Sequence, residues 1–384
     1  MERFHLLTDI YFGTDALSRL TELKSKKVFI VTDPFILKSD AIRNITRPLK
    51  KGGIPYEIFT DVIPDPPISL VIKGVKAFSE ADCDTIIGLG GGSAMDLSKS
   101  IRRMVEETGL IKEHIRLICI PTTSGTGSEV TSFAVISDPD RQVKIPLVSE
   151  SMSPDEAILD AVLVKSVPAS VTADTGMDVL THAIEAYVST NHNDFSGALA
   201  EKAVAIIGKY LYRSFNDCND EHARRKMHTA ATLAGLAFNA SSLGLNHGMA
   251  HQLGAHFHIP HGRANAMILP LVIEYNSGLS SVGVNSEYRL NDPLVERYCS
   301  IANVLGLSSV NKPMTIHSLC NYVRYMNEAM GIPSKLSDIL DMSKEEYEKH
   351  LDAMAEAALE DSCTDTNPRR PSKPEVIELY RKLW

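Results

Sequence analysis

Residues 84–99 read DTIIGLGGGSAMDLSK, an apolar run that passes through a cluster of glycines into a helix-forming segment. Residues 84–90 predict a strand, and residues 94–107 predict the helix that follows it. Glycines at such a turn let the backbone approach a pyrophosphate, while N–H groups at the helix start face the anion. Tight strand-to-helix turns also favour glycine, so the motif alone leaves phosphate binding and a plain turn as open alternatives.

The alternation of strands and helices continues on both sides of this motif. Further strands are predicted at 27–32, 56–62 and 117–121, and helices at 36–51 and 69–81. Strands that alternate with helices of this length form a parallel sheet with helices on both faces. We therefore expect residues 1–172 to form an α/β domain with a Rossmann-like parallel sheet that binds a dinucleotide.

The second half of the chain has a different pattern. After Ala169–Gly176 the β-rich runs nearly vanish, and Ala, Leu, Met, Glu and His recur at helical spacing. This pattern predicts an all-helical domain over residues 173–384. Because no Gly/Ser-rich linker separates the halves, we expect the two domains to pack tightly, with a ligand-binding cleft between them.

The composition argues against several classes of function. The chain has 384 residues, 44% hydrophobic residues and a net charge of −9, and it has no long run of Lys or Arg. Nucleic acid is therefore not an expected partner. No segment reaches the ~18 apolar residues of a membrane span, and the N-terminus lacks the apolar core of a signal peptide. We expect a cytoplasmic protein that binds no membrane and whose six cysteines are reduced.

A second polar loop follows the strand predicted at 117–121. Residues 121–129 read PTTSGTGSE, and their hydroxyl and N–H groups suit contacts to a phosphate or to the amide of a nicotinamide. Doubly wound sheets bind nucleotides at the carboxyl ends of their strands, where both loops are expected. The alternative is a surface loop rich in turn formers. The motif G-x-x-x-x-G-K-[ST] does not occur, which removes the main support for an ATPase.

Asp33 ends the first predicted strand. A carboxylate there accepts hydrogen bonds from a ribose diol and repels a 2′-phosphate, which favours NAD over NADP. Because Pro34 follows, Asp33 also suits a helix N-cap, and both roles can hold at once.

Histidines cluster in the second half. Five of the 13 histidines lie in one short run: His247, His251, His256, His258 and His261. Upstream, Asp178 and His182 are four residues apart, so they share one helix face. An ionised Asp on an apolar helix face is unfavourable unless it is paired or bound to a metal. With two of the downstream histidines, this pair offers one oxygen and three nitrogens, which suits Fe(II) or Zn(II). A buried Asp–His hydrogen bond without metal is the alternative.

Taken together, the motifs resemble those of the iron-containing (group III) alcohol dehydrogenases. They are GGGSAMDLSK (90–99), PTTSGTGSEVT (121–131), TGMDVLTHAIEAY (175–187) and the histidine run, with Asp361 and Asn367–Arg369 near the end. The resemblance covers essentially the whole chain. It implies a dehydroquinate synthase-like architecture of an α/β and an all-α domain. It also implies NAD(H) and one divalent metal as cofactors, Fe(II) first and Zn(II) second.

The resemblance also assigns roles residue by residue. The metal ligands it implies are Asp178, His182, His247 and His261, with His251 as a catalytic residue that exchanges a proton. The cofactor contacts it implies are Asp33, Gly91, Gly92, Ser93, Asp96, Thr122, Thr123, Thr126, Ser128, Lys144 and Leu163. Family members commonly dimerise through an N-terminal strand, here around Leu6–Phe12, so a homodimer or higher homo-oligomer is expected.

Within the family, the chain resembles most the 1-propanol dehydrogenases of propanediol-utilisation microcompartments. This implies interconversion of short aldehydes and primary alcohols, such as propanal and 1-propanol. Because such relatives belong to microcompartments, the resemblance also implies shell proteins as a further partner. Ethanol, 1,3-propanediol and lactaldehyde/1,2-propanediol dehydrogenases are alternatives in the same family. An alternative of another class is a non-catalytic, microcompartment-associated binding protein. Dehydroquinate synthase activity is disfavoured, because residues 244–261 contain no Lys or Arg to hold a phosphorylated acid.

Overall fold

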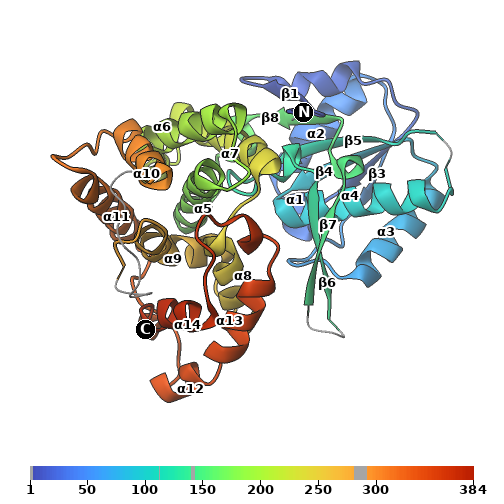
Figure 1. Cartoon of the computed structure of the whole chain (residues 1–384). Coiled ribbons are helices and arrows are strands. Elements are labelled where there is room, and N and C mark those ends of the chain that lie inside the picture. The colour runs from blue at the N-terminus through green and yellow to red at the C-terminus, as the bar shows by residue number, and fades with distance from the viewer. Residues whose placement is uncertain (1–2, 112, 140–142, 281–291) are drawn as a thin grey trace. The chain divides into compact units, whose positions relative to one another are not determined.

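The chain divides into two compact units, Met1–Val167 and Pro168–Trp384. The structure, a computed structural model, describes residues 3–111, 113–139, 143–280 and 292–384. Figure 1 shows strands and helices in the first unit and helices in the second. The boundary expected between residues 172 and 173 falls inside α5 (Ala169–Val188). The first three residues of that helix are exposed, and its buried residues begin at Thr172.

The first unit is built on a six-stranded parallel sheet. Its strand order is β1-β8-β5-β4-β2-β3. The strands are β1 (Asp9–Phe12), β2 (Val28–Val31), β3 (Tyr56–Phe59), β4 (Thr85–Gly90), β5 (Arg116–Pro121) and β8 (Glu156–Leu159). Gly90 of β4 lies opposite Pro121 of β5, so the loops that follow these neighbouring strands start side by side. The predicted Rossmann-like parallel sheet is confirmed.

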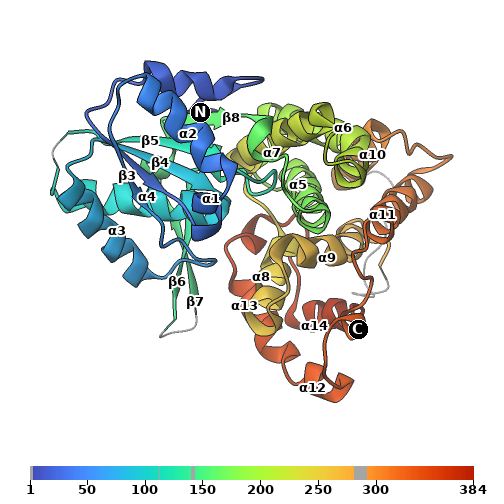
Figure 2. The ribbon, with the colours of Figure 1, turned by 180° about the vertical axis from the view of Figure 1, so that it is seen from behind.

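Side chains alternate between the two faces of this sheet. In β2, Phe29 and Val31 join one apolar cluster, whereas Val28 and Ile30 join the other. One face is covered by α3 (Ile68–Ala81) and α4 (Gly92–Glu107), and the other by α2 (Asp40–Lys51) and the 3-10 helix η1 (Ala16–Glu22). The arrangement can be followed from both sides in Figure 1 and Figure 2. Strands buried on both faces are continuous apolar runs, as in a covered parallel sheet.

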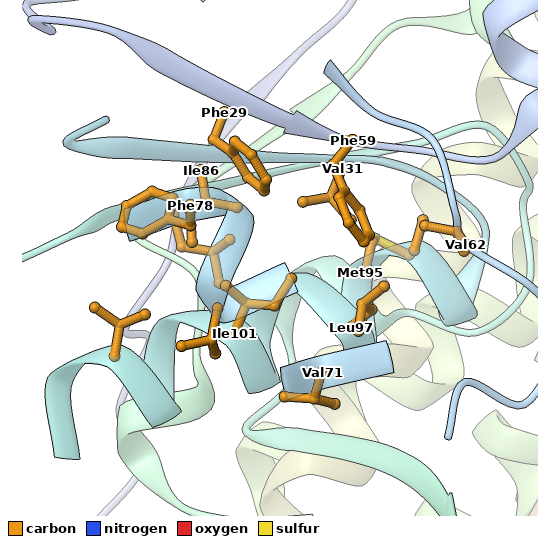
Figure 3. Close-up of a cluster of buried hydrophobic side chains, with 14 of the residues drawn as sticks. Phe29, Val31, Phe59, Val62, Val71, Phe78, Ile86, Met95, Leu97 and Ile101 are labelled. Carbon is orange, nitrogen blue, oxygen red and sulfur yellow. The ribbon is translucent and has the colours of Figure 1, made fainter. Parts of the chain in front are cut away.

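Aromatic residues fill the cluster under α3 and α4. Figure 3 shows Phe29 between Phe59 and Phe78. The rings of Phe29 and Phe78 meet edge to face, with centroids 5.5 Å apart. Cys83 and Cys119 belong to the same cluster, where they pack as small apolar residues. All six cysteines of the chain are free in this structure.

Two local features differ from the sequence prediction. The helix expected over 36–51 is divided into α1 (Pro34–Lys38) and α2, because Ser39 is extended and its Oγ caps α2 by accepting from Ala41 N at 3.1 Å. An antiparallel hairpin of β6 (Phe133–Asp138) and β7 (Val143–Val148) follows the second polar loop. It was not predicted, because its half-exposed strands lack the long apolar run of the central ones.

The second unit is all-helical over its described residues. Its helices are α5, α6 (Asp194–Asn216), α7 (Glu221–Ser241), α8 (Leu245–Phe257), α9 (His261–Asn276), α10 (Pro293–Val304), α11 (Lys312–Ala329), α12 (Lys344–Glu348), α13 (Leu351–Glu360) and α14 (Lys373–Arg381). Helix α9 packs against both α5 and α8. No helix in the described part of the chain combines the length and apolar character needed to cross a membrane.

His228 gives the helical unit a testable response to pH. It lies on α7 and is 3% exposed, and burial lowers its pKa from 6.5 to about 4. Between these two values, the unfolded chain binds a proton that the folded chain does not. The free energy of unfolding should therefore fall as the pH drops from 6.5 toward 4, by up to ~1.4 kcal/mol per pH unit.

We expect His228→Leu to lose this contribution. Its melting temperature, measured by calorimetry from pH 7 down to pH 5, should fall less steeply than that of the wild type. The same substitution at the exposed His317 serves as the control and should follow the wild type. Equal slopes for His228→Leu and the wild type would show that His228 is not held neutral by burial.

Candidate functional site

Three helices of the second unit bring one carboxylate and three imidazoles together. Helix α5 carries Asp178 and His182 one turn apart, α8 carries His247, and α9 begins at His261. Oδ1 of Asp178 lies within 4 Å of an Nε2 atom of each imidazole, at 3.9 Å (His182), 3.7 Å (His247) and 3.6 Å (His261). The four ligand atoms all lie within 4.8 Å of one another. Only the His261 side chain is substantially exposed, at 41%, so the cluster is accessible from that side.

A glycine lets α9 approach α5 closely enough to form this cluster. A Cβ atom at Gly262 would lie 2.2 Å from the carbonyl oxygen of Asp174 and 3.2 Å from Cβ of Asp178. Any side chain at position 262 would therefore push the start of α9 away from α5. Because His261 is the preceding residue, this contact is what brings its imidazole to Asp178.

Glu185 orients the imidazole of His247. It lies on α5, is 3% exposed, and its Oε2 contacts Nδ1 of His247. Its Oε1 accepts from the backbone N–H of Asn246 at 2.8 Å, at the start of α8. Burial raises the pKa of Glu185 to about 8, and hydrogen bonds from backbone N–H groups of Asn246 and His247 oppose that rise. When Glu185 is ionised, it accepts from Nδ1, so His247 carries its proton there and presents the Nε2 lone pair to the cluster.

His251 forms a separate pair next to the cluster. Its Nδ1 lies 2.6 Å from Oδ2 of Asp361, and its ring stacks on that of His261 with centroids 5.3 Å apart. Burial alone would raise the pKa of Asp361, but the hydrogen bond and charge of His251 hold it below its usual value. The other two histidines of the run lie elsewhere: His256 contacts His350, and His258 ends α8 in a left-handed conformation.

The two loops after β4 and β5 also meet. Gly90 has φ +154, a conformation that suits glycine, and its carbonyl accepts from Thr122 N at 2.9 Å. A Cβ atom at Gly91 would lie 3.6 Å from Oγ1 of Thr123, and one at Gly92 would lie 3.0 Å from Cγ2 of Thr126. Glycines under these threonines keep the start of α4 close to the second loop. The first N–H groups of a helix have no partner within the helix, so they are available to an anion.

The buried side chain of Lys99, on the helix that follows the first loop, is hydrogen-bonded to the end of the second loop. Nζ of Lys99 donates to Ser128 Oγ at 2.8 Å and to the carbonyl oxygens of Thr131 and Phe133. Ser128 Oγ in turn donates to Oδ1 of Asp96 at 2.7 Å. Burial lowers the pKa of Lys99, and the charge of Asp96 opposes this. Asp96 and Ser128, predicted as cofactor contacts, therefore bond inside the protein and support the loops.

The remaining predicted cofactor residues differ in their surroundings. Oδ1 of Asp33 caps α1 by accepting from Phe35 N and Ile36 N at 2.8 and 2.9 Å, and Oδ2 faces the Gly90 turn. Ser93 lies in the first turn of α4 and is half-buried. Leu163 packs in the apolar core on the α2 face, so its side chain offers little surface to a ligand. Lys144 pairs with Ser137 in the hairpin, and its side chain lies outside the described part of the chain.

Sequence reasoning gave no role to several residues that touch the candidate ligands. Glu185 and Asp361 appeared only within the motifs that carry the family resemblance, although Glu185 contacts the candidate ligand His247 and Asp361 pairs with the catalytic candidate His251. Asn265 was missed, although it lies four residues after His261 and its amide contacts Asp178 Oδ1 at 2.7 Å. The available signal was spacing: Glu185 is seven residues after Asp178, and Asn265 follows His261 at the same interval that separates Asp178 from His182. Lys99, three residues after Asp96, could have been found in the same way.

Comparisons with known proteins agree with the resemblance drawn from the motifs. Residues 8–161 match the protein family "Iron-containing alcohol dehydrogenase", and residues 172–384 match "Fe-containing alcohol dehydrogenase family, C-terminal". The chain is 40% identical to 1-propanol dehydrogenase PduQ of Citrobacter freundii, covering 100% of both proteins. It is 37% identical to the NADPH-dependent butanol dehydrogenase of Clostridium saccharobutylicum, covering 100% of the chain and 98% of the relative.

A solved structure extends the likeness to three dimensions. The chain is similar to 1,3-propanediol oxidoreductase with a TM-score of 0.89 and 32% identity, covering 100% of both chains. These likenesses in sequence and in structure each cover the whole chain. The chain belongs to the iron-containing alcohol dehydrogenase family, whose members are oxidoreductases that interconvert alcohols and aldehydes.

Proposed function

We propose that the protein uses NAD(H) to interconvert short aldehydes and primary alcohols at a divalent metal held by Asp178, His182, His247 and His261. The observation that carries this proposal is the convergence of one carboxylate oxygen and three imidazole nitrogens from α5, α8 and α9. Propanal and 1-propanol are the proposed substrate pair, supported by the likeness to 1-propanol dehydrogenase PduQ.

The donor set fits a divalent transition metal. Among its described contacts, the carboxylate of Asp178 meets imidazoles and one amide but no Lys or Arg. Donor atoms around a tetrahedral ion with bonds of about 2.1 Å lie roughly 3.4 Å apart, slightly closer than the separations found here. One oxygen and three nitrogens do not discriminate strongly between Fe(II) and Zn(II). The family favours Fe(II), and Zn(II) is the second candidate.

The chain's own residues supply positioning and proton transfer. A metal in this cluster would act as a Lewis acid on the oxygen of the substrate. Asp178 neutralises part of the cation's charge, and Glu185 keeps His247 in the tautomer that can bind it. His251 is proposed to pass a proton between the substrate oxygen and solvent, which is supported by its pairing with Asp361 and its one-third exposed side chain.

NAD(H) is proposed to bind at the loops that follow β4 and β5. The nicotinamide would supply the hydride chemistry. Gly91, Gly92 and Ser93 at the start of α4 are assigned to the pyrophosphate, with Thr123 and Thr126 opposite them. Oδ2 of Asp33 is assigned to the ribose, because both capping bonds of this residue use Oδ1. The butanol dehydrogenase relative is described as NADPH-dependent, so coenzyme preference requires a direct test.

Assembly and location remain predictions. A homodimer through the N-terminal strand is supported by the place of β1 at one edge of the sheet, where Phe12 is 72% exposed. Docking to microcompartment shell proteins, and a cytoplasmic location inside such a compartment, are supported only by the likeness to PduQ. Ethanol, 1,3-propanediol and lactaldehyde stay as alternative substrates, which steady-state kinetics with C2–C4 aldehydes would rank.

The metal site is tested by Asp178→Ala. We expect this variant to lose stoichiometric metal, measured by elemental analysis after reconstitution with Fe(II) or Zn(II). Its kcat/KM for propanal with NADH should fall at least a thousandfold, or roughly 4 kcal/mol of transition-state stabilisation. Asp174→Asn is the matched control, because Asp174 lies one turn earlier on α5 and pairs with Arg263. Metal retained by Asp178→Ala would refute the site, and a wild type with neither metal nor turnover would support the non-catalytic binder.

The ribose role of Asp33 is tested by two variants. Removing the carboxylate should raise the ratio of kcat/KM with NADPH to that with NADH by about tenfold, because one like-charge contact is worth on the order of 1.4 kcal/mol. Asp33→Gly removes the side chain, whereas Asp33→Asn removes the charge and keeps an acceptor for the α1 cap. Unchanged coenzyme preference in both variants would leave Asp33 with the capping role alone.

Glu185→Gln tests the support of His247. The amide can donate to Nδ1 and move the imidazole proton to Nε2, the atom needed by the metal. We expect metal affinity, measured by competition with a chelator, to fall 10–100-fold, the range found for outer partners of metal ligands. Glu201→Gln is the control. This carboxylate accepts a 2.6 Å hydrogen bond from the hydroxyl of Tyr187 and is not part of the ligand cluster. Equal metal affinity in wild type and Glu185→Gln would remove this role.

A further inference from the structure

Asn265 lies against three of the four proposed metal ligands. Its side-chain nitrogen Nδ2 is 2.7 Å from Asp178 Oδ1, 3.1 Å from His247 Nε2 and 3.1 Å from His261 Nε2. Asn265 is fully buried on α9, one turn after His261. The amide has two N–H bonds, which the three acceptors share. These contacts are made to the same atoms that would bind the cation.

A second asparagine fixes the orientation of this amide. Nδ2 of Asn246 donates to Oδ1 of Asn265 at 2.8 Å and lies 3.2 Å from its backbone oxygen. Exchanging the oxygen and nitrogen of Asn265 would bring two NH₂ groups together, so Oδ1 must face Asn246. The N–H bonds of Asn265 therefore point toward Asp178 and the imidazoles. Asn246 is itself held by Glu185, which accepts from its backbone N–H.

Hydrogen bonding and metal binding at these imidazoles exclude each other. The Nε2 atom of an unprotonated imidazole has one lone pair, which can accept an N–H or bind a cation but cannot do both. For Asp178, which is 3% exposed, the amide of Asn265 is the hydrogen-bond donor at 2.7 Å. In the metal-free protein, the amide thus supplies the partial positive charge that a buried carboxylate and two lone pairs require.

We propose that Asn265 is a positioning residue that stands in for the cation in the metal-free protein. It keeps Asp178, His247 and His261 together while no metal is bound, and it gives up the two imidazole contacts when the metal enters. This inference rests on the proposed metal site. It assigns Asn265 the opposite effect from Glu185: Glu185 bonds to a nitrogen that the metal does not use, whereas Asn265 competes for the atoms that the metal needs.

The two states should therefore respond differently to the loss of the amide. Asn265→Ala should lower the melting temperature of the metal-free protein by on the order of 5 °C, because a buried carboxylate loses its donor. The Zn²⁺-loaded protein should lose less, because the cation supplies the charge. The bond to Asn246 is lost in both states and cancels in the difference. Linkage then requires the variant to bind Zn²⁺ more tightly, by about tenfold.

The experiment uses the full chain and two measurements other than activity. Calorimetry gives the melting temperature of the metal-free and Zn²⁺-saturated protein, and competition with a chromogenic chelator gives the Zn²⁺ affinity. Asn265→Asp is the second variant, because it keeps the size and the acceptor for Asn246 but places a negative charge near Asp178. It should widen the gap between the two melting temperatures further. Asn327→Ala is the control, because its buried amide donates to the carbonyl of Ala266 at 2.7 Å and touches no ligand.

The sign of the change decides the outcome. A wider gap and tighter Zn²⁺ binding in both Asn265 variants, with an unchanged gap in Asn327→Ala, supports the proposal. Weaker Zn²⁺ binding, or equal losses in both states, overturns it and makes Asn265 an ordinary support of the ligands. A wild type whose melting temperature does not respond to Zn²⁺ or Fe(II) contradicts the proposed metal site itself. That failure is distinct, because it is seen before any Asn265 variant is measured.

Discussion

The buried carboxylate of Asp178 is the constraint on which the helical unit depends. Its side chain sits on α5 among apolar residues, and a charge in such a place is unfavourable unless opposite charge or hydrogen-bond donors surround it. The amide of Asn265 donates to this carboxylate, and a cation shared with three imidazoles would supply the opposite charge in the proposed function; the groups concerned come from α5, α8 and α9. The contacts that pack these three helices together are therefore the same contacts that form the site.

Hydrogen bonds between residues next to the ligands hold these helices in place. Glu185 on α5 holds His247 on α8, and the neighbouring Asn246 holds Asn265 on α9. The C-terminal segment closes the same network, since Oδ1 of Asn367 accepts from Leu245 N at the start of α8. Every helix that carries a ligand is thus tied to another by a buried polar contact. Such buried polar networks hold functional groups within the narrow limits that a metal centre requires.

The α/β unit follows the same physical rule with a different ion. Lys99 is buried under the two glycine- and threonine-containing loops, and four oxygen atoms of residues 128, 131 and 133 surround its ammonium group. The hydroxyl of Ser128 in turn donates a hydrogen bond to Asp96. The loops that face a nucleotide in the proposed function are therefore held in shape by a buried charged group.

The sequence by itself determined the fold class, the family and the four candidate ligands. Strand runs separated by helices specify a covered parallel sheet, and residues four apart on a helix must share a face, so Asp178 and His182 could be paired without a structure. The family resemblance named His247 and His261 as their partners, but only the tertiary structure shows how His261 reaches this pair, through the close approach of α9 to α5 at Gly262. The tertiary structure also decided that Asp96 and Ser128 bond to a buried network, that Leu163 lies in the core, and that Asn265 faces the ligands. Contacts between residues far apart in the chain have no local periodicity, so spacing along one helix can suggest such residues but cannot show which of them meet.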